Sequence, residues 1–275
     1  MASAELSDPR SARVRRLQRL ARRAYRAQQR RFLAEGTQAV REAIVASRDG
    51  RATVTELLVT PDARERDAAL VAEALRAEVQ VTVASKEVVA ALSETVTPQG
   101  VVAVVSYLDV PLTNAVAAGS SLVAVLADVR DPGNAGSAVR AADAAGADAV
   151  VFAGDCVDPY NGKVVRSSVG GLFHLPVCVG VSADEAIDHI RDAGLRVLVA
   201  DGAADVSLDD SAVTSRLSEP TAWVFGNEAW GVGEQVTRRA DEVVRIPIYG
   251  AAESLNLATA VALCLYASAR EQRQS

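Results

Sequence analysis

The sequence predicts an α/β protein of two domains, in which a small α/β domain precedes a larger domain built on a parallel sheet. Helical and strand patterns alternate along all 275 residues, a length that suits one large or two ordinary domains. The strands expected in the second half are continuous apolar runs, which is typical of a parallel sheet covered on both faces. A stretch of small and polar residues at 109–120 is typical of a linker between the two domains.

A basic segment, residues 1–31, opens the chain. Ten arginines and no acidic residue lie from Arg10 to Arg31, whereas the other 19 basic residues are outnumbered by 35 acidic ones. Val14, Leu17 and Leu20 recur at helical spacing, which predicts a basic amphipathic helix. A phosphate-binding arm and a helix packed on its own domain both fit this pattern, because arginine binds phosphate oxygens in a bidentate way. The net charge of −6 by itself argues mildly against a nucleic-acid partner.

The first domain is expected over 32–108. Its titratable residues form no cluster that suggests chemistry, so we expect it to bind or position a partner. In order, its expected elements are a helix at 32–50, a strand at 54–60, a helix at 66–80, a strand at 81–85, a helix at 86–95 and a strand at 100–109.

The second domain is expected over 121–275. Its helices lie between the strands, and the last one is expected at about 255–270. Its expected strands are 122–129, 148–154, 174–180, 196–201, 221–227 and 242–248.

Composition excludes several classes of protein. No apolar run reaches the ~20 residues of a membrane span, and the N-terminus lacks the apolar core of a signal peptide. We therefore expect a soluble, cytoplasmic protein with no membrane partner. Three widely spaced cysteines and two histidines fit neither a disulfide framework nor a metal site, so no metal is expected.

Three glycine-containing loops follow strands of the second domain, where ligands of parallel sheets bind. They are "RDPGNAGSAVR", "WVFGNEAWGVG" and "IPIYGAAESLN". Each loop alone is explained as a turn and a helix cap, with Asn134 as a cap and Asn256 inside the first turn of the last helix. The first loop lacks the G-x-G-x-x-G spacing, which disfavours a nicotinamide-dependent oxidoreductase.

Taken together, N-x-G-x-x-x-R, F-G-N-E and I-P-I-x-G-x-x-x-S-L-N closely resemble the SpoU (TrmH) family of RNA ribose 2′-O-methyltransferases. The resemblance covers 122–270. The first domain is similar to the L30e-like substrate-binding domain of many members, with "FLAEG" as the best match, and the pair resembles the thiostrepton-resistance type of ribosomal RNA methyltransferase. The spacing of Lys163, Arg166, Ser168, Gly170 and Phe173 also matches the family.

This resemblance implies a deep trefoil knot in the second domain, S-adenosylmethionine as cofactor, and a homodimer through the knotted domains. It also implies methyl transfer to a ribose 2′-hydroxyl of RNA, with 23S ribosomal RNA favoured over transfer RNA because of the two-domain layout. A non-catalytic RNA-binding protein on the same fold is the alternative from another class.

The resemblance also implies roles for individual residues. Arg140 activates the 2′-hydroxyl either by losing a proton or by anchoring an RNA phosphate that takes it. The second role is favoured because arginine holds its proton. Glu228 is expected to fix Asn134 and the knot loop. The implied catalytic set is Asn134, Arg140, Glu228, Ser254 and Asn256; the cofactor set is Phe225, Gly226, Asn227, Ile246, Ile248 and Leu255; the RNA-binding set is Arg15, Arg16, Arg19, Arg22, Arg23, Lys163, Arg166 and Ser168.

Overall fold

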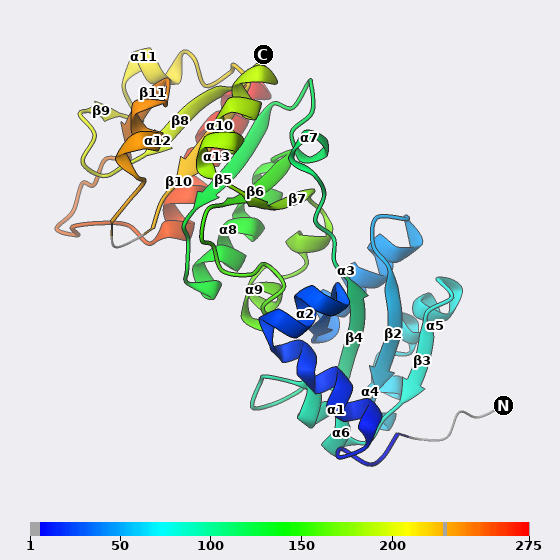
Figure 1. Cartoon of the computed structure of the whole chain (residues 1–275). Coiled ribbons are helices and arrows are strands. Elements are labelled where there is room, and N and C mark those ends of the chain that lie inside the picture. Colours follow the sequence, from blue (N-terminus) through cyan, green and yellow to red (C-terminus); the bar gives the residue numbers. More distant parts are fainter. Residues whose placement is uncertain (1–5, 228–229, 275) are drawn as a thin grey trace. The chain divides into compact units, whose positions relative to one another are not determined.

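The computed structural model describes residues 6–227 and 230–274 (Figure 1). The chain forms two compact units. Unit 1 comprises Met1–Leu108 and Asp158–His174, and unit 2 comprises Asp109–Val157 and Leu175–Ser275.

The basic segment of unit 1 forms two short helices, not the single helix expected. Helix α1 (Ala12–Gln18) leads into a 3-10 turn, η1 (Arg19–Ala21), and helix α2 (Arg23–Gln29) follows. The break falls at Arg22, whose backbone is extended. Val14 and Leu20 are buried in the core of unit 1, so the segment packs on its own unit.

A four-stranded mixed sheet forms the centre of unit 1, in the order β1-β4-β2-β3. The helix expected from residue 32 is wrong at its start. Residues 31–35 form β1, which pairs antiparallel with β4, and Gly36 separates β1 from the helix with a φ of 89° that favours glycine. The elements are β1 (Arg31–Glu35), α3 (Thr37–Arg48), β2 (Val54–Val59), α4 (Pro61–Arg66), α5 (Ala68–Arg76), β3 (Gln80–Val83), α6 (Lys86–Leu92) and β4 (Val101–Ser106).

The segment Asp158–His174 folds inside unit 1, although it lies within the second domain expected from the sequence. It holds α9 (Gly162–Ser167), which packs on β1, and the 3-10 turn η2 (Gly171–Phe173). Asp158 forms a buried ion pair with Arg26 at 2.6 Å. The ring of Tyr160 stacks on that of Tyr107 with centroids 3.9 Å apart. The domain limits expected from the sequence stay a prediction, but this segment packs with unit 1.

Unit 2 is built on a seven-stranded sheet in the order β7-β6-β5-β10-β8-β11-β9, and every adjacent pair is parallel (Figure 1). All six expected strands are present, and the two-residue β9 adds to them. The strands are β5 (Leu122–Ala127), β6 (Ala149–Ala153), β7 (Val177–Val181), β8 (Arg196–Ala200), β9 (Val206–Ser207), β10 (Thr221–Phe225) and β11 (Glu242–Arg245).

Helices cover both faces of this sheet. On one face α8 (Pro132–Ala145) packs against α13 (Leu257–Gln272), and both contact β5. On the other face α7 (Leu112–Ala115), α10 (Ala183–Asp192) and α12 (Glu234–Arg238) contribute to one apolar core with the strands. A short helix, α11 (Ser211–Thr214), precedes β10.

The strand order places the site. After β5 the chain proceeds outward through β6 and β7, and β10 later returns beside β5 at the centre of the sheet. The carboxyl ends of β5 and β10 therefore meet where the strand order reverses, the usual ligand position in such sheets. The trefoil knot stays a prediction. No described helix is long and apolar enough to cross a membrane.

Candidate functional site

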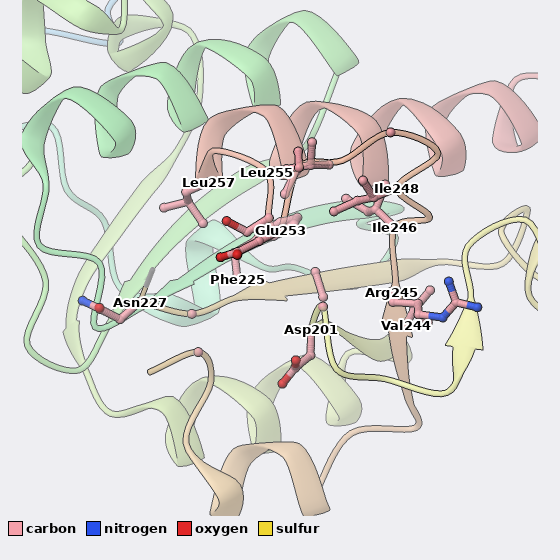
Figure 2. A pocket seen from close by; sticks show the side chains of 18 residues that line it. Asp201, Phe225, Asn227, Val244, Arg245, Ile246, Ile248, Glu253, Leu255 and Leu257 are labelled. Carbon is pink, nitrogen blue, oxygen red and sulfur yellow. The ribbon is translucent and has the colours of Figure 1, made fainter. Parts of the chain in front are cut away.

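A cavity of about 560 Å³ opens at the carboxyl ends of β8, β10 and β11 (Figure 2). Three segments of unit 2 enclose it. They are the turn after β8, the loop after β10, and the segment from the end of β11 to the first turn of α13. This is the edge of the sheet at which the sequence predicts a ligand.

All six residues expected to bind a cofactor line this cavity. The labelled side chains of Figure 2 come from both sides of it, with Phe225 at the end of β10 and Leu255 just before α13. The cavity also exposes charged side chains that the sequence reasoning missed, namely Asp201, Arg245 and Glu253. Asp201 follows β8 directly, so a search of every strand end would have found it, whereas its position beside β10 depends on the strand order.

The loop after β10 is closed by two backbone hydrogen bonds between Asn227 and Gly231, of 3.0 and 2.7 Å. Gly226 allows this closure, because a Cβ atom there would lie 2.2 Å from the carbonyl carbon of Gly231. The Asn227 side chain donates to the backbone carbonyl of Asp128 at 3.0 Å, which joins this loop to the loop after β5. Glu228 lies outside the described residues, and its expected role stays a prediction.

A second hydrogen bond joins the loop after β5 to the third loop. The Asn256 side-chain nitrogen donates to the Asn134 side-chain oxygen at 2.8 Å. Asn134 is not the cap of α8, since Asp131 caps that helix by accepting from the Asn134 backbone N–H at 2.7 Å. Asn256 is itself the cap of α13 and does not lie inside its first turn. Ser254 is exposed and lines the cavity.

Arg140 lies in α8, four residues beyond Gly136, and is exposed. It forms no ion pair with any residue in the described part of the chain. A guanidinium without a carboxylate partner is available to an external anion such as a phosphate. Arg140 is not among the residues that line the cavity.

The residues expected to bind RNA differ in their accessibility. The five arginines of the basic segment that are expected to bind RNA are exposed, and so is Lys163. Arg166 forms ion pairs with Glu35 at 2.5 Å and Glu94 at 3.3 Å. Ser168 is buried and its hydroxyl donates to the Val165 carbonyl, and its expected RNA contact stays a prediction. The five exposed arginines, hereafter the arginine set, are Arg15, Arg16, Arg19, Arg22 and Arg23.

The cysteines do not supply a nucleophile or a base to this site. Burial raises the pKa of Cys156 to about 11 and that of Cys178 to about 11, so both thiols are protonated at neutral pH. Over 6–227 and 230–274, no group of histidine, cysteine, aspartate and glutamate side chains is arranged to hold a metal ion.

Comparison with known families gives two matches that together span most of the chain. Residues 121–266 match the SpoU rRNA Methylase family. Residues 11–103 match the MRM3-like substrate binding domain.

Known proteins resemble both units together. The 23S rRNA (guanosine(2553)-2′-O)-methyltransferase RlmP of Bacillus subtilis is 34% identical over 237 residues, which cover 86% of this chain and 87% of the relative. Among solved structures, the SpoU methyltransferase AviRb of Streptomyces viridochromogenes in complex with AdoMet is similar with a TM-score of 0.81 and 31% identity, covering 97% of this chain and 99% of that one. An AdoMet-bound rRNA methyltransferase of Sinorhizobium meliloti has a TM-score of 0.80 and 27% identity, with 97% of each chain covered.

Proposed function

The chain belongs to the SpoU rRNA methylase family, and we propose that its reaction is methyl transfer from S-adenosylmethionine to a ribose 2′-hydroxyl of 23S ribosomal RNA. One observation supports this assignment above others. The three loops that carry the family's motifs meet at one sheet edge, where Asn227 bonds the loop after β5 and Asn256 bonds Asn134.

The cavity suits S-adenosylmethionine in size and chemistry. A volume of about 560 Å³ falls within the range of small-molecule sites. Ile246, Ile248 and Leu255 provide apolar contact for an adenine ring, and Asp201 and Glu253 provide carboxylates for a cationic ligand. The bound cofactor supplies the electrophilic methyl group.

The residues of the chain supply orientation and a route for the proton. An in-line displacement requires the ribose oxygen, the methyl carbon and the sulfur to be aligned, and a fixed site provides this alignment. The Asn134–Asn256 pair holds the first and third loops together, so the ribose has a rigid surface to bind. Arg140 anchors an RNA phosphate, which accepts the 2′-hydroxyl proton, because a guanidinium stays protonated at neutral pH.

Unit 1 supplies affinity for RNA. The arginine set is exposed along α1, η1, the break at Arg22 and α2, and Lys163 is exposed in α9. Lysine and arginine side chains bind the backbone phosphates of a nucleic acid whatever its nucleotide sequence. A ribosomal RNA substrate is consistent with a cytoplasmic enzyme.

We also propose that two copies associate through unit 2. Leu263 and Tyr266 are 44% and 51% exposed, and they lie three residues apart on α13, so they share one helix face. A second copy would cover this apolar face. Light scattering should report a dimer for the wild type and a monomer for Leu263→Arg, and a wild-type monomer at micromolar concentration would contradict the proposal.

Arg140→Ala tests the mechanism. We expect S-adenosylmethionine affinity within about twofold of wild type, because Arg140 does not line the cavity. Single-turnover transfer of labelled methyl to a 23S rRNA transcript should fall by at least about 100-fold, the usual loss of one group that stabilises the transition state. Arg140→Lys should also be slow, because the lysine ammonium group cannot form the planar, bidentate hydrogen bonds that a guanidinium makes to a phosphate. Transfer at close to the wild-type rate in Arg140→Ala would refute this role.

Two alternatives have distinct outcomes in the same assay. A transfer RNA methyltransferase would label an unmodified transfer RNA transcript in preference to the 23S rRNA transcript. A non-catalytic RNA-binding protein would bind RNA without labelling either one. Mass spectrometry of the labelled RNA should locate the methyl group on a ribose, and a methylated base would overturn the reaction proposed here.

A further inference from the structure

An exposed tryptophan lies beside the cavity and has no part in the chemistry described above. Trp230 is 57% exposed, whereas the other tryptophan of the chain, Trp223, is fully buried. An indole ring has a large apolar surface, and leaving it in water is unfavourable unless a partner covers it.

Trp230 directly precedes a hydrogen-bonded residue of the cavity wall. The next residue, Gly231, lines the cavity and is held to Asn227 by the two backbone hydrogen bonds that close the loop after β10. Gly226 is packed against Gly231 so closely that no side chain fits between them. The tryptophan is therefore one residue away from the wall of the cavity.

A guanidinium orients the ring. The Arg130 guanidinium carbon lies 5.3 Å from the centroid of the Trp230 ring, within the range of a cation–π interaction. Arg130 is itself held by an ion pair with Asp155 at 2.9 Å. Arg130 precedes Asp131, the cap of α8, so the loop that carries Asn134 and the loop that carries Asn227 both contribute to this pair.

We infer that Trp230 stacks on a nucleobase of the RNA substrate next to the cofactor cavity, with Arg130 holding the indole ring in its stacking position. Single-stranded RNA is recognised by stacking of unpaired bases on aromatic rings and on guanidinium planes. An exposed indole with a guanidinium over it combines both features. This inference rests on the proposed function, because it requires RNA to be the substrate of this site.

A set of Trp230 variants separates stacking from simple apolar contact. Trp230→Phe keeps an aromatic face, Trp230→Leu keeps apolar bulk without one, and Trp230→Ala removes both. We expect the RNA concentration for half-maximal single-turnover transfer to rise by about 5- to 150-fold in Trp230→Ala, the range for loss of one stacked base. Trp230→Leu should resemble Trp230→Ala, and Trp230→Phe should stay close to wild type. Affinity for S-adenosylhomocysteine and the melting temperature should be unchanged in all three variants.

Tryptophan emission provides a readout that does not depend on activity. Acrylamide should quench Trp230 and leave the buried Trp223 largely unaffected. Addition of the 23S rRNA transcript with S-adenosylhomocysteine should protect the wild-type emission from acrylamide, and should change nothing in Trp230→Phe. Arg130→Ala, which removes the orienting group, should reduce this protection.

The outcomes are distinguishable. The stacking inference would be overturned if the wild type methylates the transcript and Trp230→Ala does so with the same half-saturating RNA concentration. It would also be overturned if Trp230→Phe and Trp230→Leu restored transfer equally. Either outcome would leave the methyltransferase assignment intact. Loss of cofactor affinity in Trp230→Ala would also overturn it, because Trp230 would then support the cavity and not the RNA. A wild-type protein that fails to methylate or bind the transcript would overturn the proposed function and this inference with it.

Discussion

Gly226 shapes the cavity at the sheet edge, and Gly226→Ala tests whether S-adenosylmethionine binds there. A Cβ atom at this position would lie 2.2 Å from both the carbonyl carbon and the oxygen of Gly231, and 2.4 Å from the Val232 nitrogen. Non-bonded carbon atoms normally approach to ~3.5–4.0 Å, so the backbone at Gly231 would have to move by more than about 1 Å. Both Gly226 and Gly231 line the cavity, so this movement would deform the cavity itself.

The expected loss of affinity follows from this overlap. Overpacking by one carbon typically costs about 1–3 kcal/mol where the structure yields. The atoms that must yield here are backbone, which cannot escape by rotating a side chain. If the deformation opposes binding by this amount, the affinity for S-adenosylhomocysteine should fall by about 5- to 150-fold.

Calorimetric titration with S-adenosylhomocysteine measures this loss, and Gly233→Ala is the matched control. Gly233 lies two residues beyond Gly231, and a Cβ atom there would meet no atom within 4 Å. We expect Gly233→Ala to bind within about twofold of wild type. Affinity in Gly226→Ala that equals the control would refute the placement of the cofactor in this cavity. A circular dichroism spectrum like that of the wild type would show that the sheet is intact.

Three further predictions follow from hydrogen bonds, buried ion pairs and surface charge. Asn256→Asp keeps the acceptor that caps α13 and loses the donor to Asn134, so methyl transfer should fall while the melting temperature stays near wild type; Asn256→Ala should lower both, since a lost cap costs about 1 kcal/mol. Arg26→Ala should destabilise unit 1 by about 3–5 kcal/mol in hydrogen exchange, because Asp158 would stay buried without a counter-charge, whereas loss of the exposed Lys86–Asp62 pair should change its stability little. Replacing the arginine set with glutamine should make RNA binding less sensitive to salt. The slope of log K for RNA binding against log salt concentration should become less negative by about 0.7–0.9 for each RNA phosphate that the protein no longer neutralises, and an unchanged slope would assign these side chains another role. Substitution is preferable to deletion of residues 1–31, because the deletion would remove Val14 and Leu20 from the core.

The strands of unit 2 and the loops that follow them were predictable from local sequence patterns. A strand buried on both faces is mainly apolar, whatever its neighbours are, so β5, β6, β8 and β10 are visible as mainly apolar runs. The spacing of polar residues within each of the three loops could likewise be read from a short stretch of sequence. The six expected cofactor residues therefore line the cavity, and the family resemblance is confirmed by the match over 121–266.

Local sequence patterns could not predict which distant segments of the chain come into contact. Residues Arg31–Glu35 were predicted to begin a helix, but they form β1. This strand is stabilised by pairing with β4, which lies at the far end of unit 1's first segment, and the local pattern contains no sign of that pairing. The segment Asp158–His174 joined unit 1 because Asp158 pairs with Arg26, 132 residues earlier in the chain. Asp201 reached the cavity because β8 lies beside β10 in the sheet. Local patterns show the periodicity of apolar residues and so which side chains are buried. Ion pairs, strand order and the hydrogen bond between Asn134 and Asn256 depend instead on contacts between segments that are distant in the sequence.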